Sequence, residues 1–197
     1  KIKKFIVKNK RKKFSFVKSK NIYLETAKYI NQGKIVSWFQ GGSEFGPRAL
    51  GNRSILAKPF PIQIKNHINK NVKFREYFRP FAPAVLEEHA SNYFHLNQPS
   101  PHMLIACKVK KNKVNLIPAV THVDKSARVQ TVSKKSNYKF YKLINEVYRL
   151  NQIPVILNTS FNIKGQPIVN DPQDAIDCFL KYKIDKLVIG NYILSKN

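Results

Sequence analysis

The sequence is poor in acidic residues. Only 11 Asp and Glu stand against 36 Lys and Arg, which gives a formal charge of +25 over 197 residues. This imbalance favours anionic ligands over cationic ones, and nucleic acid is one such ligand because a cationic surface gains affinity by releasing counterions. Lysines scattered over a solvated surface, or steering of small phosphorylated substrates, explain the same charge. We place both of these explanations ahead of a nucleic-acid function.

The chain also has few cysteines and no long apolar run. Cys107 and Cys178 form neither a CxxC motif nor a metal-ligand spacing, which excludes a disulfide framework and favours a reduced, cytoplasmic setting. The longest apolar runs span only a few residues, so we expect no transmembrane helix, no signal sequence and no membrane partner. A hydrophobic content of 43% with 12% aromatics excludes a disordered chain.

The first twenty residues differ from the rest in composition. They carry ten basic residues and no acid. We interpret residues 1–20 as a basic linker or the end of a missing N-terminal domain, and residues 21–197 as one domain with enough length to bury a core.

Hydrophobic periodicity predicts an α/β fold. Apolar residues at helical spacing predict helices over residues 22–33, 62–72, 138–150 and 171–182. Short apolar runs predict strands over residues 34–40, 83–88, 104–109, 128–132, 154–157, 186–189 and 191–195. Strands that alternate with helices, without an internal repeat, indicate a mixed sheet flanked by helices.

Arginine is scarce and unevenly placed. Five of the seven arginines lie in three turn-rich segments, namely Arg48, Arg53, Arg75, Arg79 and Arg128, whereas the other 31 Lys and Arg residues are 29 lysines and two arginines. The planar guanidinium grips carboxylate or phosphate through two parallel hydrogen bonds, so the pattern predicts an oxyanion site. Four of the seven glycines fall beside the first two arginines, where they let a backbone approach a ligand. Structural pairing with Glu44, Glu76 and Asp124 is the alternative.

Polar residues in or directly after predicted strands complete the candidate set. Gln130 and the turn residues Asn158, Thr159, Ser160 and Asn162 offer donors and acceptors that suit a base, a ribose or a carbamoyl amide, although turn chemistry explains the turn equally well. His122 and Asp124 could form an acid/base pair or hold a metal, and we prefer a structural role for His122. We expect no metal site within this chain.

Six linked motifs carry a family resemblance. They are Trp38–Gly41, Glu44–Leu56, Lys73–Pro83, Val120–Asp124, Ala127–Val132 and Leu157–Asn162. Together they closely resemble the C-terminal domain of the NodU/CmcH carbamoyltransferase family, in register over most of the chain. The resemblance implies a YrdC-like fold, that is, an open twisted mixed sheet flanked by helices.

The resemblance also implies an activity. Domains of this family are expected to form carbamoyl-AMP from carbamoyl phosphate and ATP, with Mg²⁺ accompanying the ATP. An N-terminal domain of actin-like ATPase (ASKHA) fold, which carries its own metal and is absent here, would pass the carbamoyl group to a hydroxyl of a small molecule or sugar. This chain would therefore be the activating half of an O-carbamoyltransferase.

The resemblance assigns roles to the candidate residues. Arg48, Arg75 and Arg79 are expected to act in catalysis. Carbamoyl phosphate and ATP are expected to contact Arg48, Arg53, Arg75, Arg79, Arg128, Gln130, Asn158, Thr159, Ser160 and Asn162. Lys58 and Gln166 depart from the family pattern, which has Asp and Glu at these positions. Two alternatives follow: a non-catalytic nucleotide-binding remnant or subunit, and an RNA-binding YrdC-like module.

Overall fold

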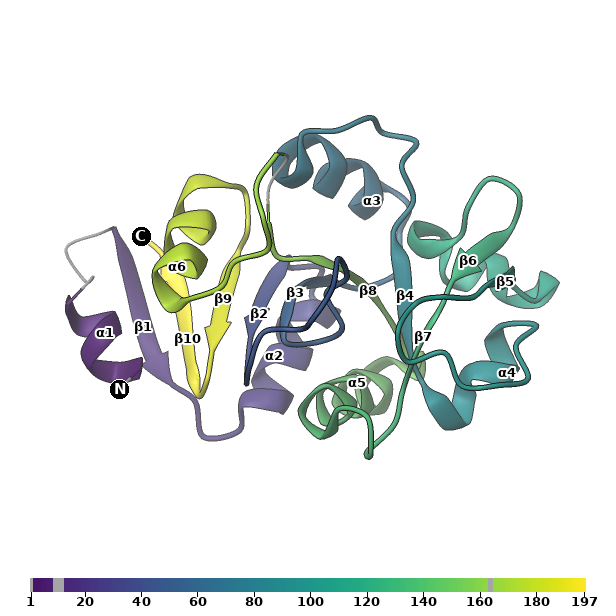
Figure 1. The fold of residues 1–197 in the computed structure, drawn as a ribbon, viewed down its shortest axis with the longest axis horizontal. Coiled ribbons are helices and arrows are strands. Elements are labelled where there is room, and N and C mark those ends of the chain that lie inside the picture. Colours follow the sequence, from purple (N-terminus) through teal and green to yellow (C-terminus); the bar gives the residue numbers. More distant parts are fainter. Residues whose placement is uncertain (1, 9–12, 163–164) are drawn as a thin grey trace.

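Eight strands form one open, mixed sheet in the order β1-β10-β9-β2-β3-β8-β4-β7 (Figure 1). The computed structural model describes residues 2–8, 13–162 and 165–197. The strands are β1 Phe14–Lys18, β2 Val36–Phe39, β3 Arg53–Ala57, β4 Ala82–Leu86, β7 Gln130–Val132, β8 Val155–Ser160, β9 Lys186–Ile189 and β10 Tyr192–Lys196. A separate pair of short strands comprises β5 Ala106–Lys108 and β6 Ser126–Arg128.

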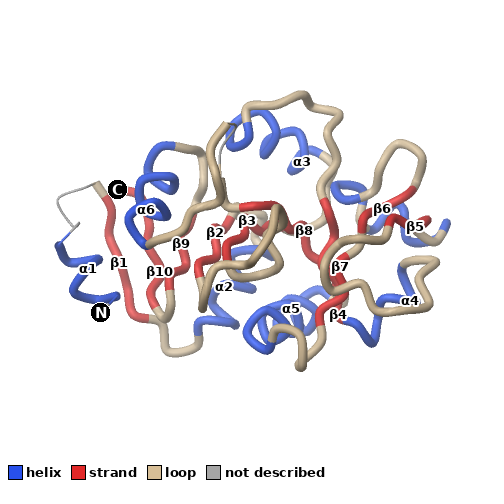
Figure 2. The backbone as a smooth tube through the Cα atoms, viewed as in Figure 1, coloured by secondary structure: helices blue, strands red, loops and turns tan. Residues whose placement is uncertain are grey.

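Helices cover both faces of the large sheet (Figures 1 and 2). They are α1 Ile2–Lys8, α2 Ile22–Asn31, α3 Gln63–Ile68, α4 Ala90–Tyr93, α5 Tyr138–Asn151 and α6 Pro172–Lys181. A π-helical turn, η1 Asn69–Lys73, extends α3, and the short 3-10 turns are η2 Glu87–His89, η3 Lys111–Leu116 and η4 Pro118–Val120. The open, mixed sheet flanked by helices that the sequence predicts is confirmed.

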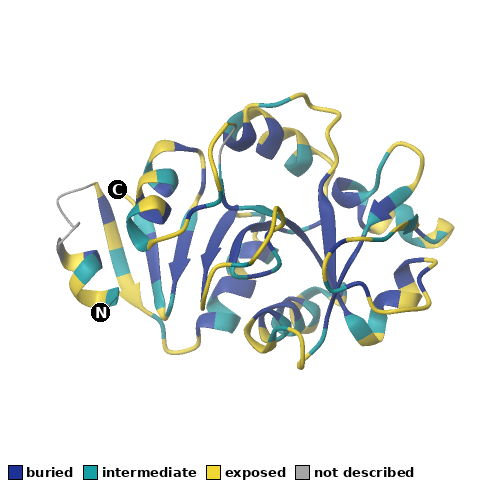
Figure 3. Ribbon diagram, viewed as in Figure 1, coloured by how far each residue is buried: buried dark blue, intermediate teal, exposed yellow. Residues whose placement is uncertain are grey.

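Two apolar cores lie on opposite faces of the sheet. Side chains alternate between the faces along each strand, so Val155 and Leu157 of β8 join the core under α3 and α6, while Ile156 joins the core under α2 and α5. Covering both faces makes the central strands largely apolar, and Figure 3 shows them as buried. No helix within the described residues has the length and apolarity needed to span a membrane.

Side-chain caps explain where the main helices begin. The side chain of Asn21 accepts a hydrogen bond from the Leu24 amide, and that of Asn137 accepts one from the Phe140 amide, so α2 and α5 each start behind an Asn cap. Asp171 and Asp174 form a capping box at α6, with Pro172 at the first helical position. These three helix starts match the sequence predictions within two residues.

The N-terminal segment differs from its prediction as a linker. Residues Phe14–Lys18 form β1, which pairs antiparallel with β10 at the edge of the large sheet, with Phe14 opposite Lys196. Phe14 and Ile6 of α1 are buried in the core. These residues therefore do not form an unstructured linker, because two apolar patches between lysines are enough to add a strand and a short helix to an exposed sheet edge. The other interpretation, the end of a further N-terminal domain, stays a prediction.

The predicted strand over residues 128–132 is two strands in the structure. Ser126–Arg128 pair with β5 in the small sheet, and Gln130–Val132 pair parallel with β4 in the large sheet. Val129 between them is buried. The hydrophobic pattern of the sequence shows one extended run here. Pairing with two different strands, β5 and β4, divides it in the structure.

The motif segments meet at one end of the central strands. Strand β8 runs antiparallel to both β3 and β4, so its last residue, Ser160, lies opposite Ser54, and Asn158 lies opposite Ala82. Strand β7 begins at the same end, with Gln130. The loop of residues 40–52 joins β2 to β3 there as well. Residues far apart in sequence are thus placed around one short stretch of backbone.

The loop of residues 40–52 depends on a close approach between Gly51 and α5. Gly51 has φ of 109°, and a Cβ built there would lie 2.3 Å from Cδ1 of Phe140. The indole Nε1 of Trp38 donates a hydrogen bond of 2.9 Å to the Gly51 carbonyl. We predict that Gly51→Ala lowers the free energy of unfolding by about 3 kcal/mol, from backbone strain plus overpacking. Urea denaturation measures this loss.

Gly46 provides the matched control. Its φ is 115°, nearly the same, but nothing lies within 4 Å of a Cβ built there. Gly46→Ala should lose only the strain component, about 1 kcal/mol. Equal losses in the two variants would contradict the proposed contact with Phe140.

Candidate functional site

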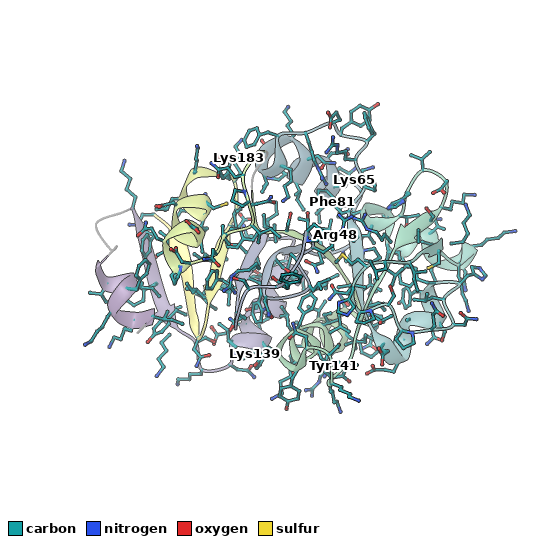
Figure 4. The ribbon with its side chains drawn as sticks, in the orientation of Figure 1. Arg48, Lys65, Phe81, Lys139, Tyr141 and Lys183 are labelled. Atoms are coloured by element: carbon teal, nitrogen blue, oxygen red, sulfur yellow. The ribbon has the colours of Figure 1, made fainter. Side chains whose placement is uncertain are left out.

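A small polar pocket lies where the motif segments meet, at one end of the central strands. Its volume is about 100 Å³. We call it the arginine pocket, and it is lined by Pro47, Arg48, Ala49, Arg75, Pro80, Phe81, Ala82, Met103, Arg128, Asn158, Thr159 and Ser160. Figure 4 shows Arg48 and Phe81 below α3, which carries Lys65. Three of the five predicted arginines therefore line one cavity.

The three pocket arginines come from three separate segments. Arg48 lies in the loop between β2 and β3, Arg75 follows the π-helical turn, and Arg128 ends β6. Burial lowers the pKa of Arg128, and the nearby positive charge of Arg48 lowers it further. The described residues that line the cavity include no Asp or Glu. Converging cations without a carboxylate favour an anionic ligand.

Arg75 is held from both sides. Its Nε donates a hydrogen bond of 2.8 Å to Oδ1 of Asn69, and its guanidinium lies 4.6 Å above the ring centre of Phe81. Asn69 also donates its own amide to the carbonyls of Tyr77 and Arg79, which fixes the bend after the π-helical turn. The guanidinium of Arg75 is thereby oriented before any ligand binds.

Arg53 occupies a different place from its predicted one. It begins β3, only 4% of it is exposed, and its guanidinium donates to the carbonyls of Gln40 and Gly41 at 2.8 and 3.2 Å. It also stacks on Phe39, with 3.6 Å from Cζ to the ring centre. The structure thus places Arg53 as a support of the loop rather than in the pocket lining.

Arg79 lies at the rim. It is exposed, and its Nε forms an ion pair of 2.9 Å with Oε2 of Glu76. Pairing with Glu76 was the alternative to ligand binding, and that pairing is present in the structure. The spacing of Arg75 and Arg79 therefore does not place both guanidinium groups in the pocket, because Arg75 turns inward while Arg79 stays outside.

The other acids near the arginines serve the backbone instead. Oε1 of Glu44 accepts hydrogen bonds from the amides of Leu50 and Asn52 at 2.9 and 2.6 Å, and from Arg53 at 3.3 Å. Oδ1 of Asp124 accepts a hydrogen bond from the Ser126 hydroxyl at 2.6 Å, and hydrogen bonding to Ser126 lowers the pKa of Asp124 to about 2. Both carboxylates shape turns that lead into the site.

Gln130 and Asn158 form a buried chain of side-chain amides. Nε2 of Gln130 donates to the Leu50 carbonyl at 2.9 Å, and Nδ2 of Asn158 donates to Oε1 of Gln130 at 2.8 Å and to the Ala49 carbonyl at 3.0 Å. Asn158 lines the pocket and Gln130 supports it from behind. Of the predicted turn residues, Asn158, Thr159 and Ser160 line the pocket, but they are the last residues of strand β8 rather than a turn, and Asn162 lies outside the lining.

Lys73 is the residue of this region that sequence reasoning missed. Its ammonium donates to the carbonyl of Ser160 and to Oδ1 of Asn162, the latter at 2.8 Å, although only 5% of the residue is exposed. It thereby ties the turn after β8 to the π-helical turn. Among 29 lysines nothing marks it, except that it stands two residues before Arg75.

The charge of Lys73 is sensitive to pH near neutrality. Burial lowers its pKa to about 7, and the adjacent Arg75 contributes in the same direction. Lys73 is therefore protonated below about pH 7 and neutral above it. A bound anion would favour the protonated form, since opposite charges stabilise each other at short range.

His122 lies beside the pocket without lining it. Its Nδ1 is 3.2 Å from the Ser126 hydroxyl, and burial lowers its pKa. These contacts agree with the structural role preferred from the sequence. In the described part of the chain, no group of three or more His, Cys, Asp or Glu could hold a metal ion.

Comparison with known proteins links this arrangement to a family. The family model described as "Carbamoyltransferase C-terminus" matches residues 27–196. Nodulation protein NolNO of Sinorhizobium fredii is 49% identical over 173 residues, which cover 86% of this chain and 25% of NolNO. Across the curated relatives compared, the chain covers between 24% and 36% of the relative's length.

Solved structures support the fold. Full-length HypF, in a phosphate- and nucleotide-bound form, superimposes with a TM-score of 0.55 at 20% identity, over 93% of this chain and 22% of HypF. Escherichia coli YciO gives a TM-score of 0.57 at 13% identity, over 86% of this chain and 78% of YciO. At these identities the likeness concerns the fold alone, and it agrees with the YrdC-like architecture that the sequence predicts.

The titration of Lys73 predicts a pH dependence of anion binding. Sulfate stays a dianion over this range, so its affinity should follow the charge of the protein. We expect the dissociation constant to rise roughly fivefold between pH 6 and pH 8.5, because loss of one nearby charge weakens binding by about 1 kcal/mol. Isothermal titration calorimetry measures it.

Lys73→Met supplies the control. This variant should bind sulfate weakly at pH 6 and show no further loss at pH 8.5, since it has no ammonium to deprotonate. His122 is present in both proteins, so its titration cancels. An equal pH dependence in both proteins would rule out Lys73 as the source.

Proposed function

The chain belongs to the carbamoyltransferase C-terminus family, and on that premise we propose that it activates a carbamoyl group by forming carbamoyl-AMP from carbamoyl phosphate and ATP. The observation that supports this most is the arginine pocket, where Arg48, Arg75 and Arg128 converge without a carboxylate. Carbamoyl phosphate, ATP and pyrophosphate are all polyanions, so each gains from these charges.

The proposed reaction has two displacements. Water first cleaves carbamoyl phosphate to carbamate and inorganic phosphate. A carbamate oxygen then attacks the α-phosphorus of ATP. The bond from that phosphorus to the oxygen that bridges the α- and β-phosphates breaks, and pyrophosphate leaves. Both steps develop charge on phosphate oxygens, so positioning and charge neutralisation contribute more than a protein nucleophile would.

The residues divide the work according to their positions. Arg48, Arg75 and Arg128 would hold phosphate oxygens inside the pocket, and Arg79 would reach the polyphosphate from the rim once it leaves Glu76. Lys73 and Arg53 would act indirectly, the first by fixing the turn at Ser160 and the second by fixing the loop that carries Arg48. Mg²⁺ would enter with ATP and be held by phosphate oxygens and water, as is usual for this ion.

The structure of HypF adds modest support. That protein was crystallised in a phosphate- and nucleotide-bound form, and part of it shares the fold of this chain. A nucleotide and a phosphate are the two ligand types that the proposed reaction requires. Family membership carries the proposal, and the shared fold agrees with it.

Transfer to an acceptor hydroxyl would need a further domain. The chain spans only 25% of NolNO, so the relatives contain ample sequence for one. Five large apolar side chains are exposed in the segments that also supply the pocket lining: Phe45, Phe74, Tyr77, Phe78 and Leu104. We propose that this apolar rim faces the N-terminal portion of the longer relatives, because an exposed patch beside a site usually marks an interface.

The alternatives predict other behaviour. An RNA-binding module would show affinity that falls steeply with salt, and a nucleotide-binding remnant would bind ATP without turnover. Lys58 and Gln166, which depart from the family pattern, both lie outside the lining of the arginine pocket, with the Lys58 ammonium 5.1 Å above the Phe60 ring centre. Their placement gives no reason to expect an inactive pocket.

Pyrophosphate exchange into ATP tests the proposed activity. We predict exchange that requires both carbamoyl phosphate and Mg²⁺. Arg75→Lys should lower it roughly 100-fold, because an ammonium cannot replace the oriented fork of the guanidinium. Arg79→Lys should lower it roughly tenfold from its position at the rim.

Arg149→Lys is the matched control for these variants. Arg149 is exposed on α5, where its guanidinium pairs with Glu146 at 3.3 Å, so exchange should be unchanged. A folded chain without any exchange would favour the remnant. Near-normal exchange in Arg75→Lys would remove this residue from the proposed site.

The apolar rim predicts a difference in hydrogen exchange between this chain and a full-length relative. Backbone amides of residues 76–78 should exchange quickly here, and the matching segment of NolNO should exchange at least roughly tenfold more slowly, because a docked domain would exclude water. Residues 133–137, before α5, should exchange alike in both proteins. Equal exchange at residues 76–78 would argue against docking at the rim.

A further inference from the structure

Two buried polar atoms of the arginine pocket have no hydrogen-bond partner. They are Oδ1 of Asn158, an acceptor, and Nε of Arg128, a donor. Both residues line the pocket, and only 1% of Asn158 is exposed. Leaving such an atom unsatisfied is costly, and native proteins rarely do so without a reason. A ligand in the pocket would remove the cost.

The orientation of the Asn158 amide is dictated by backbone carbonyls. The Leu50 carbonyl can only accept, so Gln130 must donate its Nε2 there and present Oε1 to Asn158. Asn158 must then donate Nδ2 to that oxygen and to the Ala49 carbonyl. A flipped amide would place oxygen against oxygen. The atom left free is therefore the acceptor Oδ1.

An acceptor among arginines places a chemical demand on the ligand. The oxygens of an ionised phosphate are acceptors too, so Oδ1 would repel them, whereas the guanidinium groups would bind them. The ligand must therefore present an N–H or O–H group next to its anionic end. Arg128 and Asn158 both line this pocket of about 100 Å³, which places their side chains within reach of one small ligand.

We propose that Asn158 Oδ1 and Arg128 Nε read the two sides of the carbamoyl group, the N–H accepted by Asn158 and the C=O bound by Arg128. Asn158 is thus the residue that selects a carbamoyl over an acetyl group, and Gln130 positions it. The inference rests on the proposed function and adds the basis of its specificity.

Acetyl phosphate is the probe that isolates the interaction. It matches carbamoyl phosphate in shape and charge but carries a methyl group in place of the amino group. A buried acceptor left facing a methyl group rejects the analogue strongly. The preference is the ratio of kcat/KM for carbamoyl phosphate to that for acetyl phosphate, measured by ATP–pyrophosphate exchange. We expect it to exceed roughly 100-fold in the natural chain.

Two variants test the assignment. Asn158→Leu should reduce the preference to within about threefold of unity, chiefly by losing activity with carbamoyl phosphate. Gln130→Met leaves Asn158 in place but frees its amide to rotate, and it should reduce the preference roughly tenfold. Asn158→Leu replaces a buried amide with an apolar side chain and could unfold the protein. Gln130→Met keeps the test valid in that case. Asn145→Leu, half-buried on α5 and outside the lining of the arginine pocket, is the control and should keep the preference.

The outcomes separate this inference from the proposed function. Exchange with carbamoyl phosphate whose preference survives both variants would overturn the role of Asn158 and leave the activity standing. A change in the preference for ATP over 2′-deoxy- or 3′-deoxy-ATP, with the carbamoyl preference intact, would overturn it in favour of a ribose hydroxyl as the donor. No exchange with either acyl phosphate would instead overturn the proposed function.

Discussion

The arginine pocket depends on the buried guanidinium of Arg53. This cation pairs with no carboxylate among the described residues. Its two terminal nitrogens donate to main-chain carbonyls, two of which belong to Gln40 and Asn52 on either side of the loop between β2 and β3. A buried charge needs such partners, so the loop cannot move away without stranding it. Arg53 thereby fixes the loop that carries Arg48, and with it one wall of the pocket.

Shifted pKa values and unpaired polar atoms gather at the arginine pocket. Arg75 and Arg128 in its lining, and the nearby Lys73, all have pKa values lowered by burial, and neighbouring cations add to the shift for each of them. Two buried atoms in the lining, on Asn158 and Arg128, have no hydrogen-bond partner. Electrostatic strain and unsatisfied polar groups gathered in one cavity are typical of functional sites, where binding relieves them.

The linear pattern located the motifs but not the role of each residue. Five arginines in turn-rich segments pointed to an oxyanion site, and three of them line the pocket. Arg53 belongs to β3, a strand that we did not predict, because a glycine-rich loop runs directly into it. Lys73 gave no signal of its own, since its importance comes from burial and from Ser160 and Asn162, 87 and 89 residues away.

The sequence by itself determined the fold class, the main helices with their caps and the family, because these follow from periodicity, local hydrogen bonds and linked motifs. Only the tertiary structure decided which residues meet. The antiparallel register of β8 against β3 and β4 sets Asn158 among the arginines, and the chain of amides through Gln130 leaves its oxygen free. Such contacts join distant segments, so their chemistry depends on strand pairing and burial, which no local pattern encodes.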